Sequence, residues 1–148
     1  MTTYLLDVNL LLALSDPMHV HHDVAHRWFK QTGRLAWATC PLTENGFVRI
    51  ASHPRYPNRP GGVEFVLDLL RQFCAVEGHH FWAEGVSIRR ALGSDVIITS
   101  DQVTDVYLLA LAAHRGGKLA TLDRSIPAAA VPGGAAALEL IEPAGARR

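Results

Sequence analysis

Four acidic residues stand at positions where a carboxylate has no ordinary partner. Asp7 and Asp123 each follow a short apolar run, YLL and KLATL, and such runs are typical of buried strands. Glu44 and Asp105 stand near the start of predicted helices, and apolar residues lie three, four and seven positions after each, so both carboxylates belong to the apolar stripe of their helix. Burying an ionised carboxylate without a partner is prohibitively unfavourable, so we expect these side chains to meet a cation.

A hard divalent cation fits this set better than a basic side chain. No lysine or arginine shares the two apolar stripes, and four convergent carboxylates would repel one another. Mg²⁺ and Mn²⁺ take oxygen ligands and are commonly held by a few carboxylates together with substrate phosphate. The alternative is that the four residues are separate helix-start and turn residues. The predicted metal ligands and catalytic residues are Asp7, Glu44, Asp105 and Asp123.

Other polar residues are predicted to play lesser parts. Asp68 lies on the polar stripe of its helix, three residues before Arg71, and is expected to be a solvated surface charge. His79 and His80 are predicted to be a packed segment rather than a pair of metal ligands. Asp101, four residues before the third acid of the set, is expected either to support the metal site from outside the ligand shell or to form a turn.

The elements that must position these acids alternate along the chain. Strands are predicted at 4–6, 35–37, 118–122 and 138–141, with a weak one at 75–76, and 53–62 is predicted to be a loop because it holds three prolines and a Gly pair. Helices are predicted at 9–15, 20–30, 41–51, 63–73, 84–92 and 105–115, the first capped by Asn9 and the last by Thr104. Short apolar strands that alternate with helices favour an α/β fold, a three-layer sandwich around a central parallel sheet. Ligands bind such sheets beyond the carboxyl ends of the strands, where Asp7 and Asp123 are expected.

Length and composition favour one globular domain over residues 1–148. The chain has 148 residues, of which 49% are apolar, so it can bury enough side chain to offset chain entropy. Its two cysteines, Cys40 and Cys74, are expected to be reduced thiols. No stretch approaches the ~20 apolar residues of a membrane span, and a cytoplasmic location is expected.

Three segments, in this order, carry a resemblance to a known family: YLLDVNLLLAL, TENGFVRI and TDVYLLALAAHRGGKLATLD. The chain resembles the PIN-domain ribonucleases and, more narrowly, the VapC toxins of VapBC toxin–antitoxin systems. The resemblance implies a PIN-like α/β/α fold in which the four acids form one pocket, with Asn9 and Thr121 at polar positions beside it. It also implies Mg²⁺- or Mn²⁺-dependent cleavage of transfer or ribosomal RNA, a VapB-type antitoxin as partner, and a homodimer.

The charge balance is compatible with an RNA substrate. Lys and Arg number 14, as do Asp and Glu, but the four pocket acids leave 14 basic against 10 acidic residues elsewhere, a net charge of +4. A local basic patch on and before the predicted loop could hold phosphates and stack a base on its tyrosine. Its candidate RNA-binding residues are Arg49, Arg55, Tyr56 and Arg59.

Two other functions share parts of this pattern. A metal-dependent phosphohydrolase or a nuclease acting on another substrate would use the same acids to activate water for attack on phosphorus. A non-catalytic module could instead use the acidic pocket to grip a basic segment of a partner. Substrate panels separate the first alternative from an endoribonuclease, and titration with a divalent ion separates the second.

Overall fold

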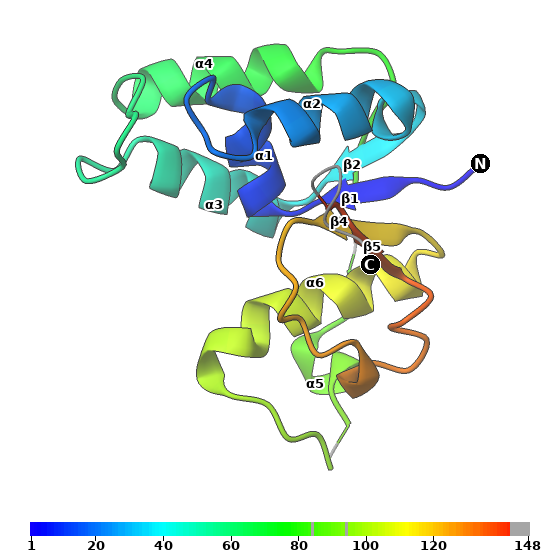
Figure 1. The fold of residues 1–148 in the computed structure, drawn as a ribbon. Coiled ribbons are helices and arrows are strands. Elements are labelled where there is room, and N and C mark those ends of the chain that lie inside the picture. Colours follow the sequence, from blue (N-terminus) through cyan, green and yellow to red (C-terminus); the bar gives the residue numbers. More distant parts are fainter. Residues whose placement is uncertain (84, 94, 143–148) are drawn as a thin grey trace.

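Five short strands form one parallel sheet in the order β3-β2-β1-β4-β5 (Figure 1). The computed structural model describes residues 1–83, 85–93 and 95–142. The strands are β1 (Tyr4–Leu6), β2 (Trp37–Thr39), β3 (His79–Phe81), β4 (Lys118–Thr121) and β5 (Leu138–Leu140).

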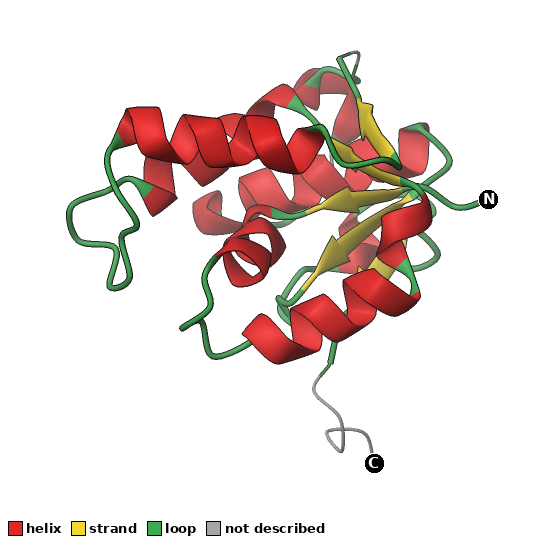
Figure 2. Cartoon of the chain, turned by 90° about the horizontal axis from the view of Figure 1, so that it is seen from above, coloured by secondary structure: helices red, strands yellow, loops and turns green. Residues whose placement is uncertain are grey.

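Helices cover both faces of this sheet, which confirms the predicted three-layer α/β/α sandwich (Figures 1 and 2). One layer contains α1 (Val8–Ser15), α2 (His22–Gln31), α3 (Pro41–Ala51) and α4 (Val63–Cys74). The other contains α5 (Ile88–Ala91) and α6 (Val103–His114). Short 3₁₀ turns lie at η1 (Gly33–Leu35), η2 (Ser100–Gln102) and η3 (Ala128–Ala130). No helix in the described part of the chain has the length and apolar character needed to cross a membrane.

Successive residues of a strand pack into the apolar clusters on opposite faces of the sheet, because side chains alternate across a strand. In β1, Leu5 packs into the cluster that contains α6, and Leu6 packs into the cluster that contains α1, α3 and α4. Leu119 and Ala120 divide in the same way in β4. All four side chains are fully buried. Both faces of these two central strands are therefore apolar, which is why β1 and β4 appear as apolar runs in the sequence.

The strand order places a ligand-binding edge between β1 and β4. The chain moves outward from β1 through β2 to β3 and then returns to β4 on the other side of β1. The connections at the carboxyl ends of β1 and β4 therefore leave in opposite directions, and parallel α/β sheets bind ligands at such a switch point.

Several predicted boundaries were wrong. The cap of α1 is Asp7, whose carboxylate accepts from the Val8 N–H, and not Asn9. The helix predicted from Asp105 begins two residues earlier, and its cap is Gln102 rather than Thr104. The second strand runs from 37 to 39 because the turn η1 occupies the residues before it.

The third strand lies at 79–81 instead of 75–76. After α4 the chain reverses at Gly78, whose φ of 99° and close approach to the Arg34 carbonyl exclude a side chain there. The helix predicted at 84–92 is described only as α5; its predicted first residue, Glu84, lies outside the described residues.

The central position of α6 gives a stability prediction. Leu109 of α6 is fully buried, whereas Leu35 is 60% exposed. We expect Leu109→Ala to lower the free energy of unfolding by about 2–5 kcal/mol, because it removes buried methyl groups and leaves a cavity. Leu35→Ala should cost under about 1 kcal/mol by the same reasoning. Urea unfolding measures both, and equal losses would contradict this description of the core.

Candidate active site

Three of the four predicted acids converge at the switch point. Asp7 follows β1, Asp123 follows β4, and Asp105 lies in the first turn of α6. The carboxyl groups of Asp105 and Asp123 share a hydrogen bond, and the charges of Asp7 and Asp123 both raise the pKa of Asp105. Residues more than 100 positions apart in the sequence are thus brought into one acidic cluster, which we call the aspartate site.

Asp7 is held from two directions and has almost no solvent contact. Its side chain is buried, with one oxygen 2.8 Å from the Val8 N–H and the other 2.8 Å from the Thr121 hydroxyl. The first bond comes from the start of α1 and the second from the end of β4. The position of this carboxylate is therefore set by the start of α1 and the end of β4, which meet at the switch point.

Thr121 and Asn9, which the family resemblance implies at polar positions beside the pocket, connect the end of β4 with the start of α1. The Thr121 hydroxyl oxygen donates to Asp7 and accepts from the Asp123 N–H at 3.0 Å and from the Asn9 amide at 3.2 Å. The Asn9 carbonyl oxygen accepts from the Leu122 N–H at 3.2 Å. Thr121 thus contacts two of the clustered acids directly, and Asn9 holds Thr121 and the backbone of Leu122 in place.

Asp123 and Asp101 differ in their surroundings. Ser125 donates to one Asp123 oxygen from both its hydroxyl, at 2.6 Å, and its N–H, at 2.8 Å, and these bonds lower the pKa of Asp123. Asp101 lies exposed in η2, where it accepts from the Thr99 hydroxyl. Its charge reaches Asp105 and contributes to the raised pKa there. Asp101 is therefore an exposed neighbour of the cluster whose charge affects Asp105.

The cluster carries more negative charge than its protein surroundings balance. Burial raises the pKa of Asp7, and burial followed by the charges of Asp7 and Asp123 raises that of Asp105 to about 6. The two ion pairs found among the described residues, Arg71 with Asp68 and Arg124 with Glu142, involve none of these aspartates. An all-oxygen donor set with unbalanced negative charge fits a hard divalent cation such as Mg²⁺ or Mn²⁺.

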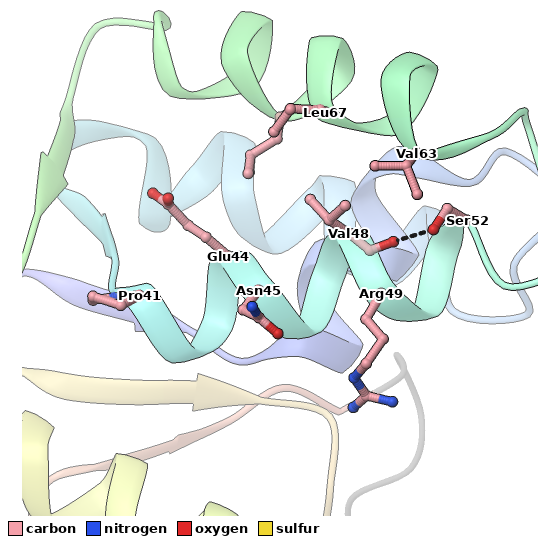
Figure 3. Close-up of a pocket in the computed structure, with 9 residues that line it drawn as sticks. Pro41, Glu44, Asn45, Val48, Arg49, Ser52, Val63 and Leu67 are labelled. Carbon is pink, nitrogen blue, oxygen red and sulfur yellow. Dashed lines mark hydrogen bonds between the residues drawn. The ribbon is translucent and has the colours of Figure 1, made fainter.

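Glu44 has different partners. Its carboxylate accepts from the Thr39 hydroxyl at 2.6 Å, and its charge acts on the pKa values of Cys74 and His79. In the groove between α3 and α4, Glu44 extends toward α4, whereas Arg49 extends away from it (Figure 3). Glu44 does lie on the half-buried side of α3, as its spacing predicted. The structure describes no interaction between it and the three aspartates, so its membership of the metal site stays a prediction.

The residues around Glu44 were missed in the sequence. Thr39 ends β2, and its buried hydroxyl also lies 2.7 Å from the His79 imidazole Nε2 of β3. Only the pairing of β2 with β3 brings these residues together, with Cys74 from the end of α4. The one available signal was the polar residue that closes an apolar strand, which is the same signal that identified Asp7.

The candidate RNA-binding residues lie on and after α3. Arg49 and Arg55 are exposed, and Arg59 is exposed while its Nε donates to the Ser52 carbonyl at 2.8 Å. Tyr56 is half-buried, and its hydroxyl donates to Asp16 at 2.8 Å. These bonds tie the proline-rich loop back to the body of the protein. Among the residues that the structure describes, Arg49 and Arg55 have no side-chain hydrogen bond like that of Arg59, so these two exposed arginines are better placed to contact phosphate.

The chain matches known proteins over most of its length. Residues 4–132 match the family described as the PIN domain. Ribonuclease VapC44 of Mycobacterium tuberculosis H37Rv is 48% identical over 134 residues, which cover 87% of this chain and 92% of that protein. Ribonuclease VapC39 of the same strain is 40% identical over 133 residues, covering 88% of this chain and 96% of that protein.

A solved structure supports the fold independently of sequence. The crystal structure of M. tuberculosis VapC20, a toxin that cleaves the sarcin-ricin loop, aligns with a TM-score of 0.60 over 87% of this chain and 96% of that one, at 9% identity. The parallel sheet with acids at its switch point is thus a PIN domain. Within that class, the chain belongs to the VapC family.

The raised pKa of Asp105 gives a prediction for the metal-free protein. The folded chain keeps a proton on Asp105 up to about pH 6, whereas the unfolded chain loses it near 3.8, so this residue's contribution to stability falls as pH rises between those values. Asp105→Asn removes that loss. In EDTA, we expect the melting temperature of the variant, relative to that of the wild type, to rise as the pH increases from about 4 to about 6.

The control for this experiment is Asp68→Asn, which alters an exposed carboxylate with an exposed partner. Its melting temperature relative to the wild type should not follow the same pH profile. If the difference in melting temperature between Asp105→Asn and the wild type stays constant across this pH range, the claim that neighbouring carboxylates raise the pKa of Asp105 is contradicted. Under the metal hypothesis, Mg²⁺ at pH 7 should also raise the melting temperature of the wild type more than that of Asp105→Asn, because an ion held only by the folded site would stabilise it.

Proposed function

We propose that this protein is a divalent-metal-dependent endoribonuclease and the toxin of a toxin–antitoxin pair. The observation that carries the proposal is the convergence of Asp7, Asp105 and Asp123 without a basic partner among the described residues. The names of the VapC44 and VapC39 relatives support RNA as the substrate. We propose a structured RNA, tRNA or rRNA, as the target, and the sarcin-ricin loop cleaved by VapC20 is one precedent.

Each aspartate has its own task in this proposal. Asp7, fixed by the Val8 N–H and the Thr121 hydroxyl, presents an oxygen whose position does not depend on the ligand. Asp105, whose pKa is raised to about 6 by burial and by the charges of Asp7 and Asp123, and Asp123 itself supply the remaining carboxylates, whose mutual repulsion a bound cation would relieve. A bound Mg²⁺ or Mn²⁺ supplies Lewis acidity that activates water and stabilises the charge that develops on phosphate. In the same proposal Glu44 completes the set of acids, either directly or through water.

The partners follow from the same chemistry. Exposed Arg49 and Arg55 would contact RNA phosphates, and Tyr56 and Arg59 would shape the loop that carries them. A VapB-type antitoxin would keep the nuclease inactive, as the VapC relationship suggests. We propose that the toxin acts as a homodimer in the cytoplasm, where its RNA targets are.

Cleavage by purified variants tests the function. We expect Asp7→Asn to fold normally, because Asn also caps helices, and to lose at least about 100-fold in cleavage rate, because it removes a ligand charge. Asp68→Asn, a surface charge, should cleave like the wild type. The readout is the rate of appearance of RNA 5′ ends in Mg²⁺ or Mn²⁺, with DNA and nucleotide substrates alongside.

Three outcomes would overturn parts of this proposal. Full cleavage in EDTA would reject metal dependence. Cleavage of DNA or small phosphate esters in preference to RNA would favour the broader phosphohydrolase. Binding of a basic peptide without cleavage of any substrate would favour the non-catalytic module. The Glu44→Gln variant tests whether Glu44 belongs to the metal site. A fall in cleavage rate as large as that of Asp7→Asn would support its membership, and an unchanged rate would exclude Glu44 from the site.

The salt dependence of RNA binding tests the arginine patch. In an Asp7→Asn background, which prevents cleavage, replacing both Arg49 and Arg55 by Ala should reduce the slope of log K against log salt by about 1.4, since each lost phosphate contact to a single strand contributes ~0.7. Arg59 is left intact because it also bonds the Ser52 carbonyl. Filter binding at several salt concentrations measures the slope, and an unchanged slope would place both arginines off the RNA path.

A further inference from the structure

A second group of potential metal ligands lies one strand away from the aspartate site. Glu44 of α3, Cys74 at the end of α4 and His79 of β3 each offer one donor atom, and these three atoms lie within 4.8 Å of one another. All three residues are half-buried. They come from three separate elements, so their proximity is a property of the tertiary fold and not of local spacing.

The donor types differ from those of the aspartate site. Thiolate, imidazole and carboxylate together are a ligand set that zinc accepts, whereas Mg²⁺ and Mn²⁺ prefer oxygen alone. Tetrahedral zinc with bonds of ~2.0–2.3 Å places its ligand atoms roughly 3.3–3.8 Å apart. The separations here exceed that range by about 1 Å at most, which side-chain rotation can close without backbone movement.

Thr39 arranges all three ligands. Its fully buried hydroxyl donates to the Glu44 carboxylate at 2.6 Å, lies 2.7 Å from His79 Nε2, and hydrogen-bonds Cys74. The His79 ring also packs against the Trp37 ring, with centroids 4.7 Å apart. These hydrogen bonds hold the three side chains together in the metal-free protein, and binding of an ion exchanges them for metal–ligand bonds. The Trp37 contact stays in place and keeps the His79 ring oriented, as contacts outside the ligand shell do in metal sites.

We propose that Glu44, Cys74 and His79 form a second cation site that takes zinc or a similar thiophilic divalent ion. The three side chains supply three ligands, and water fills the fourth position, as in zinc sites that remain open to an external ligand. Binding exchanges the Cys74 thiol proton for the metal–sulfur bond and involves no redox step. The ion joins α3, the end of α4 and β3, and it engages Glu44 on the side of α3 that faces α4. This inference rests on the three side chains and not on the ribonuclease activity. When this site holds its ion, Glu44 serves it, and the aspartate site keeps Asp7, Asp105 and Asp123; Glu44 is available to those aspartates only when the second site is empty.

Cobalt spectroscopy tests the site, because Co²⁺ substitutes for zinc and its bond to a thiolate absorbs in the near ultraviolet. The full chain is stripped with EDTA and titrated with Co²⁺ in excess Mg²⁺, which occupies the aspartate site. We expect thiolate-to-cobalt absorption that saturates at one equivalent and is displaced by Zn²⁺. Zn²⁺ should also raise the melting temperature in excess Mg²⁺, since it binds only the folded chain.

Matched variants assign the signal. Cys74→Ser and His79→Gln should each remove the absorption and weaken Zn²⁺ binding at least about 10-fold. Cys40→Ser and His80→Gln alter the other cysteine and the neighbouring histidine and should leave both unchanged. The Asp105→Asn variant should bind Co²⁺ at this site like the wild type, which distinguishes the inference from the proposed nuclease chemistry.

The proposal is overturned if the wild type shows no thiolate absorption, or if the absorption persists in Cys74→Ser. It is also overturned if Mg²⁺ displaces the bound Co²⁺, since that result would assign binding to the aspartates. Circular dichroism of each variant confirms that it has folded. Should either ligand variant misfold, the Zn²⁺-dependent melting shift of the wild type, measured with and without prior alkylation of its thiols, decides the same question.

Discussion

The repulsion among Asp7, Asp105 and Asp123 is the constraint around which this fold is arranged. The parallel sheet places the first and last of these residues at neighbouring strand ends, and α6 brings the second against them. Burial and mutual charge push the pKa values of Asp7 and Asp105 upward, and the Thr121 hydroxyl holds Asp7 in place despite that cost. Such an unfavourable group of charges persists only where the rest of the structure is stable enough to hold it. The two apolar layers on either side of the sheet supply that stability.

Much of this arrangement could be predicted from the sequence. Apolar runs ending in Asp indicated both strands that flank the site, and their alternation with helices indicated the three-layer fold. The family resemblance implies Asn9 and Thr121 beside the pocket; in the structure they bond each other, and Thr121 bonds Asp7, while their role in the reaction stays a prediction. What failed were boundaries that depend on tertiary contacts: the third strand lies beyond Gly78, because close packing against the Arg34 carbonyl sets where the chain reverses.

Glu44 shows most clearly where sequence patterns reach their limit. Its spacing correctly predicted a half-buried carboxylate in need of a partner, and it gave no direction in which to look for one. Its hydrogen-bond donor is Thr39, whose hydroxyl also contacts His79, and these two residues come from a pairing of β2 with β3 that no local pattern encodes. The result is two groups of ligands of different chemistry on adjacent strands, one all oxygen and one mixed, and selectivity between cations follows from ligand type in such a case.

A crystal structure grown with Mn²⁺ tests the central claim most directly, because the anomalous scattering of manganese locates the ion without reference to activity. The account predicts a peak within coordination distance, about 2.0–2.2 Å, of oxygens from Asp7, Asp105 and Asp123. A map with no peak there, or with a lysine or arginine side chain between the three carboxylates, would contradict it.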